Sequence, residues 1–145
     1  SEGLLLLTTD GMKSFQVRDK GIEKEYYVQV DGKITEDAIY KLQNGVEISV
    51  NGSIYLTLPS KAFVLENEPE LPPRGFKIRD ARHGPTSWIS ITICEGKNRQ
   101  IRKMTAAVGF PTLRLVRVRI GDIHLDRMNV GEVVILPDFN DALNC

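Results

Sequence analysis

Cysteine and histidine are scarce in this sequence, and their scarcity excludes several kinds of site. The cysteines are Cys94 and Cys145, and the histidines are His83 and His124. Two cysteines so far apart give no disulfide framework, and no spacing resembles the clustered Cys and His ligands of a zinc site. The sequence therefore predicts neither a disulfide scaffold nor a metal site.

Long apolar runs are absent as well. A helix that crosses a bilayer needs roughly 20 apolar residues, and no run in this chain approaches that length. The four leucines at 4–7 are too short for the core of a signal peptide with its basic flank. The sequence thus favours a cytoplasmic protein without a membrane segment.

The chain also lacks net charge, because 19 Lys and Arg residues balance 19 Asp and Glu residues. This balance conceals a segregation, since the segment 97–119 carries seven basic residues and no acidic one. The seven are Lys97, Arg99, Arg102, Lys103, Arg114, Arg117 and Arg119. One positive face on a neutral molecule suits a nucleic-acid backbone. The alternative is a solvated surface whose counter-charges lie on other segments, and composition does not choose between the two.

Strand patterns occupy the beginning of the chain. The continuous apolar run at 3–8, closed by Asp10–Gly11, predicts a strand buried on both faces. Residues 24–30 alternate aromatic or β-branched side chains with polar ones and end at Asp31–Gly32, which predicts a second strand and a turn.

A short helix and a hairpin follow. Thr35 is suited to the N-cap of a helix that ends at Gly45. The segments 46–50 and 54–58 flank Asn51–Gly52, which is a strong signal for a two-residue hairpin turn.

The second half contains another strand–helix–strand pattern after a proline-rich loop at 66–85. Strict alternation predicts a strand at 88–94. Asn98 is the expected N-cap of a helix to Val108, with Gly109 ending it.

The last long strand, at 112–120, has two chemically different faces. Alternation places Leu113, Leu115, Arg117 and Arg119 on one face and Val116, Val118 and Ile120 on the other. Short strands at 123–125 and 131–136 complete the pattern. We expect one α+β domain at 1–137, built on a mostly antiparallel mixed sheet with short flanking helices, followed by a polar tail at 138–145.

Three blocks of this sequence resemble the bacterial ribosomal RNA pseudouridine synthases of types A, B, E and F, of which type A modifies the small-subunit RNA and the others modify the large-subunit RNA. They are SEGLLLLTTDG at 1–11, KEYYVQV at 24–30, and EGKNRQIRKM at 95–104 continuing into VGFPTLRLVRVRIGD. The stretch from Pro85 to Arg117 is most similar to the E-type branch. The resemblance covers roughly residues 1–136 and implies the catalytic-domain fold of that family.

The family isomerises a uridine in ribosomal RNA, here expected to be the large-subunit RNA, after flipping the base out of its helix. It needs no metal, nucleotide or redox cofactor, which agrees with the lack of glycine-rich phosphate loops here. The resemblance implies that Tyr26 and Arg102 are catalytic and that Leu115 forms a wall of the uracil pocket. We expect RNA contacts from Gln100 and from the remaining basic residues, which are Lys97, Arg99, Lys103, Arg114, Arg117 and Arg119.

The family's catalytic aspartate is the one expected residue that the sequence does not contain. It lies in an Arg-Leu-Asp-x-x-Ser/Thr-x-Gly pattern, of which Ser1, Glu2 and Gly3 match only the end. Asp10 and Asp122 are explained by turns. We therefore expect the chain to be an N-terminally truncated piece of an enzyme, inactive alone. The alternatives are a non-catalytic RNA-binding module that uses the basic face and a ribosome-assembly or scaffold protein.

Overall fold

The computed structural model describes residues 1–7, 21–72, 84–125 and 128–135. The predicted turn at Asp10–Gly11, both His83 and Cys145, and the predicted tail at 138–145 lie outside these residues. The proline-rich segment is without helix or strand over 66–72 and 84–85, and its remainder is likewise outside.

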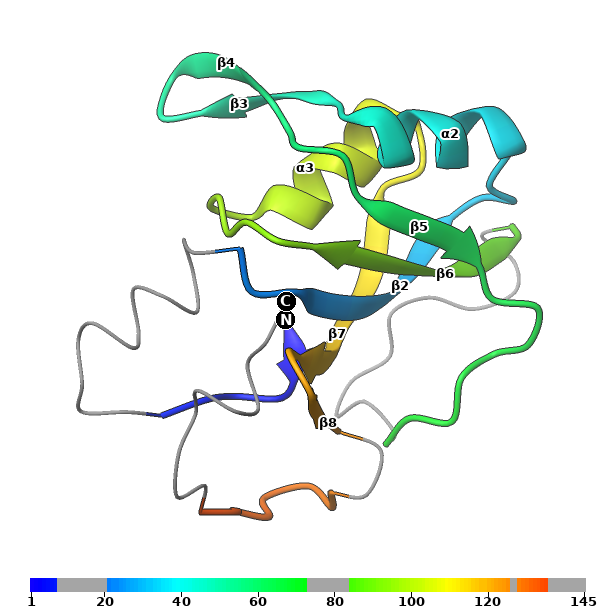
Figure 1. Cartoon of the computed structure of the whole chain (residues 1–145). Helices are drawn as coiled ribbons and strands as arrows, with labels where there is room; N and C mark the ends of the chain where they lie inside the picture. The colour runs from blue at the N-terminus through cyan, green and yellow to red at the C-terminus, as the bar shows by residue number, and fades with distance from the viewer. Residues whose placement is uncertain (8–20, 73–83, 126–127, 136–145) are drawn as a thin grey trace.

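Six strands in the described ranges form one sheet (Figure 1). Its long strands are β2 (Lys24–Asp31), β6 (Thr86–Ile93) and β7 (Thr112–Ile120), and its short ones are β1 (Glu2–Gly3), β5 (Lys61–Val64) and β8 (Ile123–His124). The order is β1-β7-β2-β6-β5, with β8 also paired to β7. The central strand β2 is antiparallel to both neighbours, and β1 runs parallel to β7. The predicted α+β fold with a mostly antiparallel sheet is confirmed.

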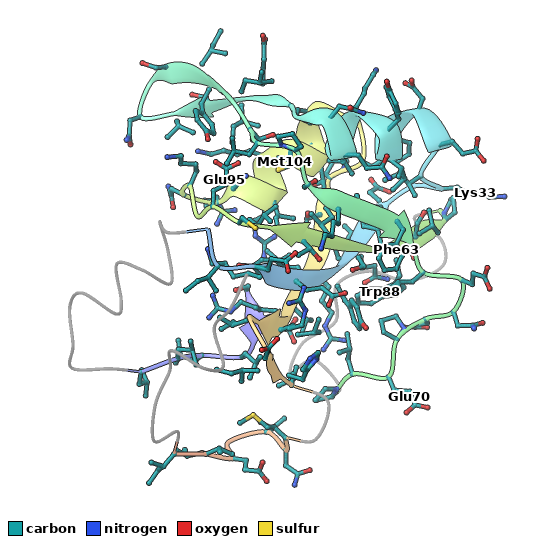
Figure 2. The ribbon with its side chains drawn as sticks, viewed as in Figure 1. Lys33, Phe63, Glu70, Trp88, Glu95 and Met104 are labelled. Carbon is teal, nitrogen blue, oxygen red and sulfur yellow. The ribbon has the colours of Figure 1, made fainter. Side chains whose placement is uncertain are left out.

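Two helices, α2 (Glu36–Asn44) and α3 (Gln100–Ala107), lie on the same side of the sheet (Figure 1). The main core fills the space between them and the sheet. Its fully buried side chains include Val28 of β2, Ile89 of β6, Leu42 of α2 and Met104 of α3. Because side chains alternate along a strand, Trp88 is directed to the opposite face of the sheet from Ile89 (Figure 2).

Local signals predicted the first helix and the hairpin correctly. Thr35 caps α2 by accepting a hydrogen bond from the backbone N–H of Ala38 at 3.2 Å. The hairpin consists of β3 (Glu47–Val50) and β4 (Ser53–Leu56). Its turn residues Asn51 and Gly52 have φ of 51° and 79°, which are the left-handed angles of a type I′ turn.

The predicted strand at 3–8 is wrong in both length and burial. Regular pairing is confined to β1. Beyond it Leu4 is buried, whereas Leu5 and Leu7 are 71% and 77% exposed. The reason is that β1 pairs at the edge of the sheet with β7 alone among the described strands, so alternate leucines face outward.

One strand was missed and another was predicted wrongly, because both cases depend on partners that the sequence does not reveal. The strand β5 was not expected, because it is short and only Ala62 in it is buried. Conversely, residues 131–135 form no strand and are exposed, with Val133 at 82% and Ile135 at 90%. β-Branched side chains favour strands only where a neighbouring strand and a core accept them.

The start of α3 differs from the prediction. Its N-cap is Arg99, not Asn98, and Arg99 has a left-handed backbone with φ of 54° and no side-chain capping hydrogen bond. At the other end the C-cap is Val108, so the predicted cap Gly109 is the first residue after it. Gly109, with φ of 92°, donates to the carbonyl of Ala106, and Phe110 donates to that of Thr105, which is the Schellman arrangement.

Candidate active site

Tyr26 lies in the middle of the central strand β2. It is paired with Arg117 on β7 and with Ile91 on β6, while Val28 is paired with Leu115. Residues paired across strands point to the same side, so Tyr26, Leu115 and Arg117 share one face. Leu115 is 8% exposed and belongs to the main core, and Tyr26 packs against that core. This is the face that α2 and α3 cover.

Arg102 lies on α3 and is half-buried. Burial, together with the positive charges of Arg102, Arg117 and Arg99, lowers the pKa of the Ser1 amino group below its ordinary value. The arginines that contribute to this shift lie on α3, at its N-cap and on β7.

Strand β1 is attached to β7 by the side chains of two predicted RNA contacts. Arg114 donates to both carboxylate oxygens of Glu2, from Nε and Nη2, at 2.9 Å each. Arg117 donates from Nε and Nη2 to the backbone carbonyl of Leu4, at 2.9 and 2.6 Å. Both guanidinium groups therefore have partners within the chain.

The alternation along β7 is interrupted, so the prediction that Arg117 and Arg119 point the same way is wrong. The pairing with β2 shifts so that Arg119 lies opposite Glu25 while Arg117 lies opposite Tyr26. Since Glu25 and Tyr26 are adjacent and face opposite ways, the bulge at Val118 turns Arg119 to the other face. There Arg119 donates from Nε to Oε1 of Glu25 at 3.2 Å.

The remaining predicted basic contacts lie around α3 and the hairpin. Lys97 places Nζ 5.0 Å from the ring centroid of Tyr55, within the range of a cation–π contact. Lys103 donates from Nζ to the carbonyl of Ser49 at 2.7 Å. Lys97 and Arg99 are exposed. These three cations form a group at the N-terminal end and flank of α3.

Gln100 is buried at 3% exposure, and its amide is used inside the chain. Its Nε2 donates to Oε2 of Glu95 at 2.9 Å, and its Oε1 accepts from the backbone N–H of Lys97 at 3.1 Å. The side chain thus joins the end of the β6–α3 loop to its beginning.

Glu95 is the feature of this region that sequence reasoning did not single out. It lies between the hairpin and the start of α3 (Figure 2) and is 8% exposed. Besides Gln100, it accepts hydrogen bonds from the hydroxyl of Tyr55 and from the N–H of Leu58, the latter at 2.8 Å. The hydrogen bond to the carboxylate, with burial and the negative charge, raises the pKa of Tyr55 to about 12. An acidic residue directly before a long basic segment was the available signal.

Metal-binding clusters and membrane-spanning helices are both absent from the part of the chain that the structure describes. No group of three or more His, Cys, Asp or Glu side chains there is arranged to bind a metal ion. Among the helices of these residues, none is both long and apolar enough to cross a membrane.

Comparison with known families identifies similar sequences. The family model described as "RNA pseudouridylate synthase" matches residues 1–107. "Ribosomal large subunit pseudouridine synthase E" of Vibrio parahaemolyticus is 45% identical over 135 residues, covering 91% of this chain and 54% of that protein. The protein of the same name from Xanthomonas axonopodis is 43% identical, covering 88% and 66%.

More distant relatives have names of the same kind. "Ribosomal large subunit pseudouridine synthase B" of Yersinia pestis is 32% identical, covering 88% of this chain and 35% of that protein. A solved structure titled "Crystal structure of pseudouridylate synthase" matches with a TM-score of 0.64 and 28% identity, over 86% of this chain and 46% of the other. The chain therefore spans only about half to two thirds of these E-type relatives, which are more similar to it than the B-type protein.

Proposed function

Since the chain belongs to the RNA pseudouridylate synthase family, we propose that it is part of an enzyme that converts a uridine of large-subunit ribosomal RNA to pseudouridine. The observation that carries the proposal is the shared sheet face of Tyr26, Leu115 and Arg117, next to the helix that bears Arg102. The choice of large-subunit RNA as substrate is based on the names of the relatives, of which the E-type proteins are 42–45% identical to this chain. Residues 1–137 are then one catalytic domain that lacks its N-terminal segment.

Tyr26 and Leu115 on this face each have a role suited to their chemistry. The ring of Tyr26 stacks on the flipped uracil, and its hydroxyl hydrogen-bonds or moves a proton near C5. Leu115 closes the apolar side of the uracil pocket. Flipping is required because the reacting atoms are unreachable inside a stacked helix.

The nucleophile in this proposal is an aspartate three residues upstream of Ser1. Three residues of extended chain span at most about 10 Å, so this carboxylate stays near β1, which pairs with β7 at Val116 and Arg117. A guanidinium fork holds a carboxylate in a fixed orientation better than a lysine does. We assign that role to Arg102 and expect the 145-residue chain to be inactive by itself.

Phosphate contacts come mainly from Lys97 in the β6–α3 loop, Arg99 at the N-cap of α3 and Lys103 on α3. Phosphate contacts position RNA without reading its sequence. Arg114, Arg117 and Arg119 have partners within the chain, so any contact with RNA comes from their remaining donors. The burial of Gln100 favours an indirect contribution, through the conformation of the β6–α3 loop.

A tritium-release assay on ribosomal RNA labelled at uridine C5 tests the proposal. A longer form of the protein that includes the residues upstream of Ser1 should release tritium, and the 145-residue chain should not. In the longer form, Tyr26→Phe should abolish turnover with RNA binding largely unchanged. Tyr27→Phe is the matched control, because Tyr27 pairs with Val116 and Ser90 and faces the other side of the sheet.

Two results would contradict parts of this proposal. Robust turnover by the 145-residue chain would show that no upstream aspartate is needed. A longer form that binds ribosomal RNA without releasing tritium would favour the non-catalytic RNA-binding module instead.

A further inference from the structure

Strand β1 is too short to be held by backbone pairing alone. It contains Glu2 and Gly3 and pairs with β7, whereas strands in globular proteins usually have about five or six residues. Side chains must supply the rest of its attachment. Two arginines of β7 do so, one through a side chain of β1 and the other through the backbone that follows it.

The first attachment is the pair Arg114–Glu2. Two parallel hydrogen bonds of 2.9 Å join the guanidinium to the carboxylate, which is the bidentate geometry that adds directional control to charge attraction. The Arg114 side chain is 12% exposed, so water competes little for it. Its Nη2 also donates to the carbonyl of Pro72 at 2.6 Å, which fixes the guanidinium from a second segment.

The second attachment surrounds the peptide groups of Gly3 and Leu4. Arg117 donates twice to the Leu4 carbonyl, and the Leu4 N–H donates to the Arg117 carbonyl at 3.0 Å. Gly3 has φ of 95°, and a Cβ there would lie 2.2 Å from the Arg117 carbonyl oxygen. The two backbones therefore approach as closely as glycine permits. The Leu4 side chain is buried with Ile22 and Ile120.

We propose that Arg114 and Arg117, acting on Glu2 and the Leu4 carbonyl, form a clamp that positions the segment upstream of Ser1 for catalysis. We call these four groups the β1 clamp. The inference rests on the proposed function. Arg114 and Arg117 are then positioning residues, with a role different from the phosphate contacts expected from their charge.

The geometry explains why such a clamp matters. The clamp fixes the position and direction of the chain at Glu2, within four residues of the proposed aspartate. A displacement of about 1 Å in a catalytic group costs up to about 100-fold in rate, so a loosened β1 lowers turnover even where RNA still binds.

The test is a charge exchange in the longer form of the protein. Arg114→Glu places two carboxylates together and should lower the single-turnover rate by about 10- to 100-fold, with the Kd for ribosomal RNA changed by less than about threefold. Adding Glu2→Arg should restore most of the rate. Arg114→Lys keeps the charge but loses the fork, and should give an intermediate rate.

A phosphate-contact role predicts a different pattern. In that case Arg114→Glu raises the Kd, the salt dependence of RNA binding becomes weaker, and Glu2→Arg does not restore the Arg114→Glu variant at fixed RNA saturation. That pattern, or an unchanged rate in all three variants, overturns the inference. If Arg114→Glu fails to fold, as judged by its thermal melt, Arg114→Lys and the double variant still decide.

The matched control reverses a charge in an exposed pair. Lys41 lies 3.2 Å from Asp37 on α2, with side chains 60% and 75% exposed, so Lys41→Glu should leave the rate unchanged. Failure of the proposed function would appear separately, as a longer wild-type protein without tritium release, and would overturn the inference with it. An active wild type with an insensitive clamp contradicts the inference alone.

Discussion

Tyr55 and Glu95 form a residue-scale pair whose energetics can be tested by pH. The protonated phenol of Tyr55 donates a hydrogen bond to Oε1 of Glu95. Because the pKa of Tyr55 is raised from 10.0 to about 12, the pair contributes fully to stability below pH 10. This contribution is lost as the pH rises through about 12.

The expected outcome is a fall in the free energy of unfolding over this interval that is steeper in the wild type than in Tyr55→Phe. Below about pH 9 the variant should be less stable by about 1–2 kcal/mol, since one hydrogen bond to a charged acceptor is removed. Urea denaturation of both proteins from about pH 8 to 12 measures the difference, on the usual scale where about 1.36 kcal/mol corresponds to one pKa unit. Parallel curves would contradict the assignment.

The sequence revealed which residues carry charge, but not which charges are already paired. The seven basic residues of 97–119 were evident from composition. The carboxylate partners of Arg114 and Arg119 are 112 and 94 residues away, so only the tertiary fold brings them together. The direction of Arg119 was also hidden, because a bulge leaves no reliable mark in a strand pattern.

At the scale of elements, Glu95 connects the β6–α3 loop, the hairpin and the linker after it. It does so through Gln100, Tyr55 and the N–H of Leu58. Elements with such local signals as a Thr N-cap or an Asn-Gly turn were predictable, whereas their docking was not. The short strands β1 and β5 were missed or misjudged because their existence depends on distant partners.

Removing the Glu95 carboxylate should loosen these three elements together. Glu95→Ala leaves buried donors without an acceptor, for which we expect a loss of about 3 kcal/mol in unfolding free energy. Glu95→Gln keeps one oxygen acceptor and should cost less. Guanidinium denaturation gives the stabilities, and hydrogen exchange at Leu58 reports the linker. Equal stability of Glu95→Ala and wild type would refute the docking role.

The net charge of the whole molecule is zero, but its basic residues differ in whether a carboxylate of another segment lies beside them. Carboxylates of other segments neutralise Arg114 and Arg119. Lys97 and Lys103 instead contact an aromatic ring and a backbone carbonyl. Composition left open an RNA-binding face and a surface balanced by other segments. Arg114 and Arg119 fit the second alternative, while Lys97 and Lys103 are residues for which we propose contacts with RNA.

This difference among the basic residues predicts which of them make RNA binding depend on salt. Lys97→Ala should reduce the slope of log K against log salt for ribosomal RNA by about 0.7–0.9, the value for one phosphate contact, while Lys41→Ala should not change it. Filter binding of the longer protein at several salt concentrations supplies the slopes. An unchanged slope in Lys97→Ala would remove Lys97 from the RNA surface.

The parallel pairing of β1 with β7 also determines when β1 can join the sheet during synthesis of the chain. Glu2 is paired with Val116 and Gly3 with Arg117, so the earliest of the described strands to leave the ribosome pairs with one of the last. Such distant contacts form late, because chain entropy must be lost before they stabilise anything. The hydrogen bonds of α2 and of the hairpin join residues close in the sequence, whereas the arginines can meet Glu2 and Leu4 only after β7 has been made. The attachment of β1 to β7 therefore forms late in the synthesis of the chain.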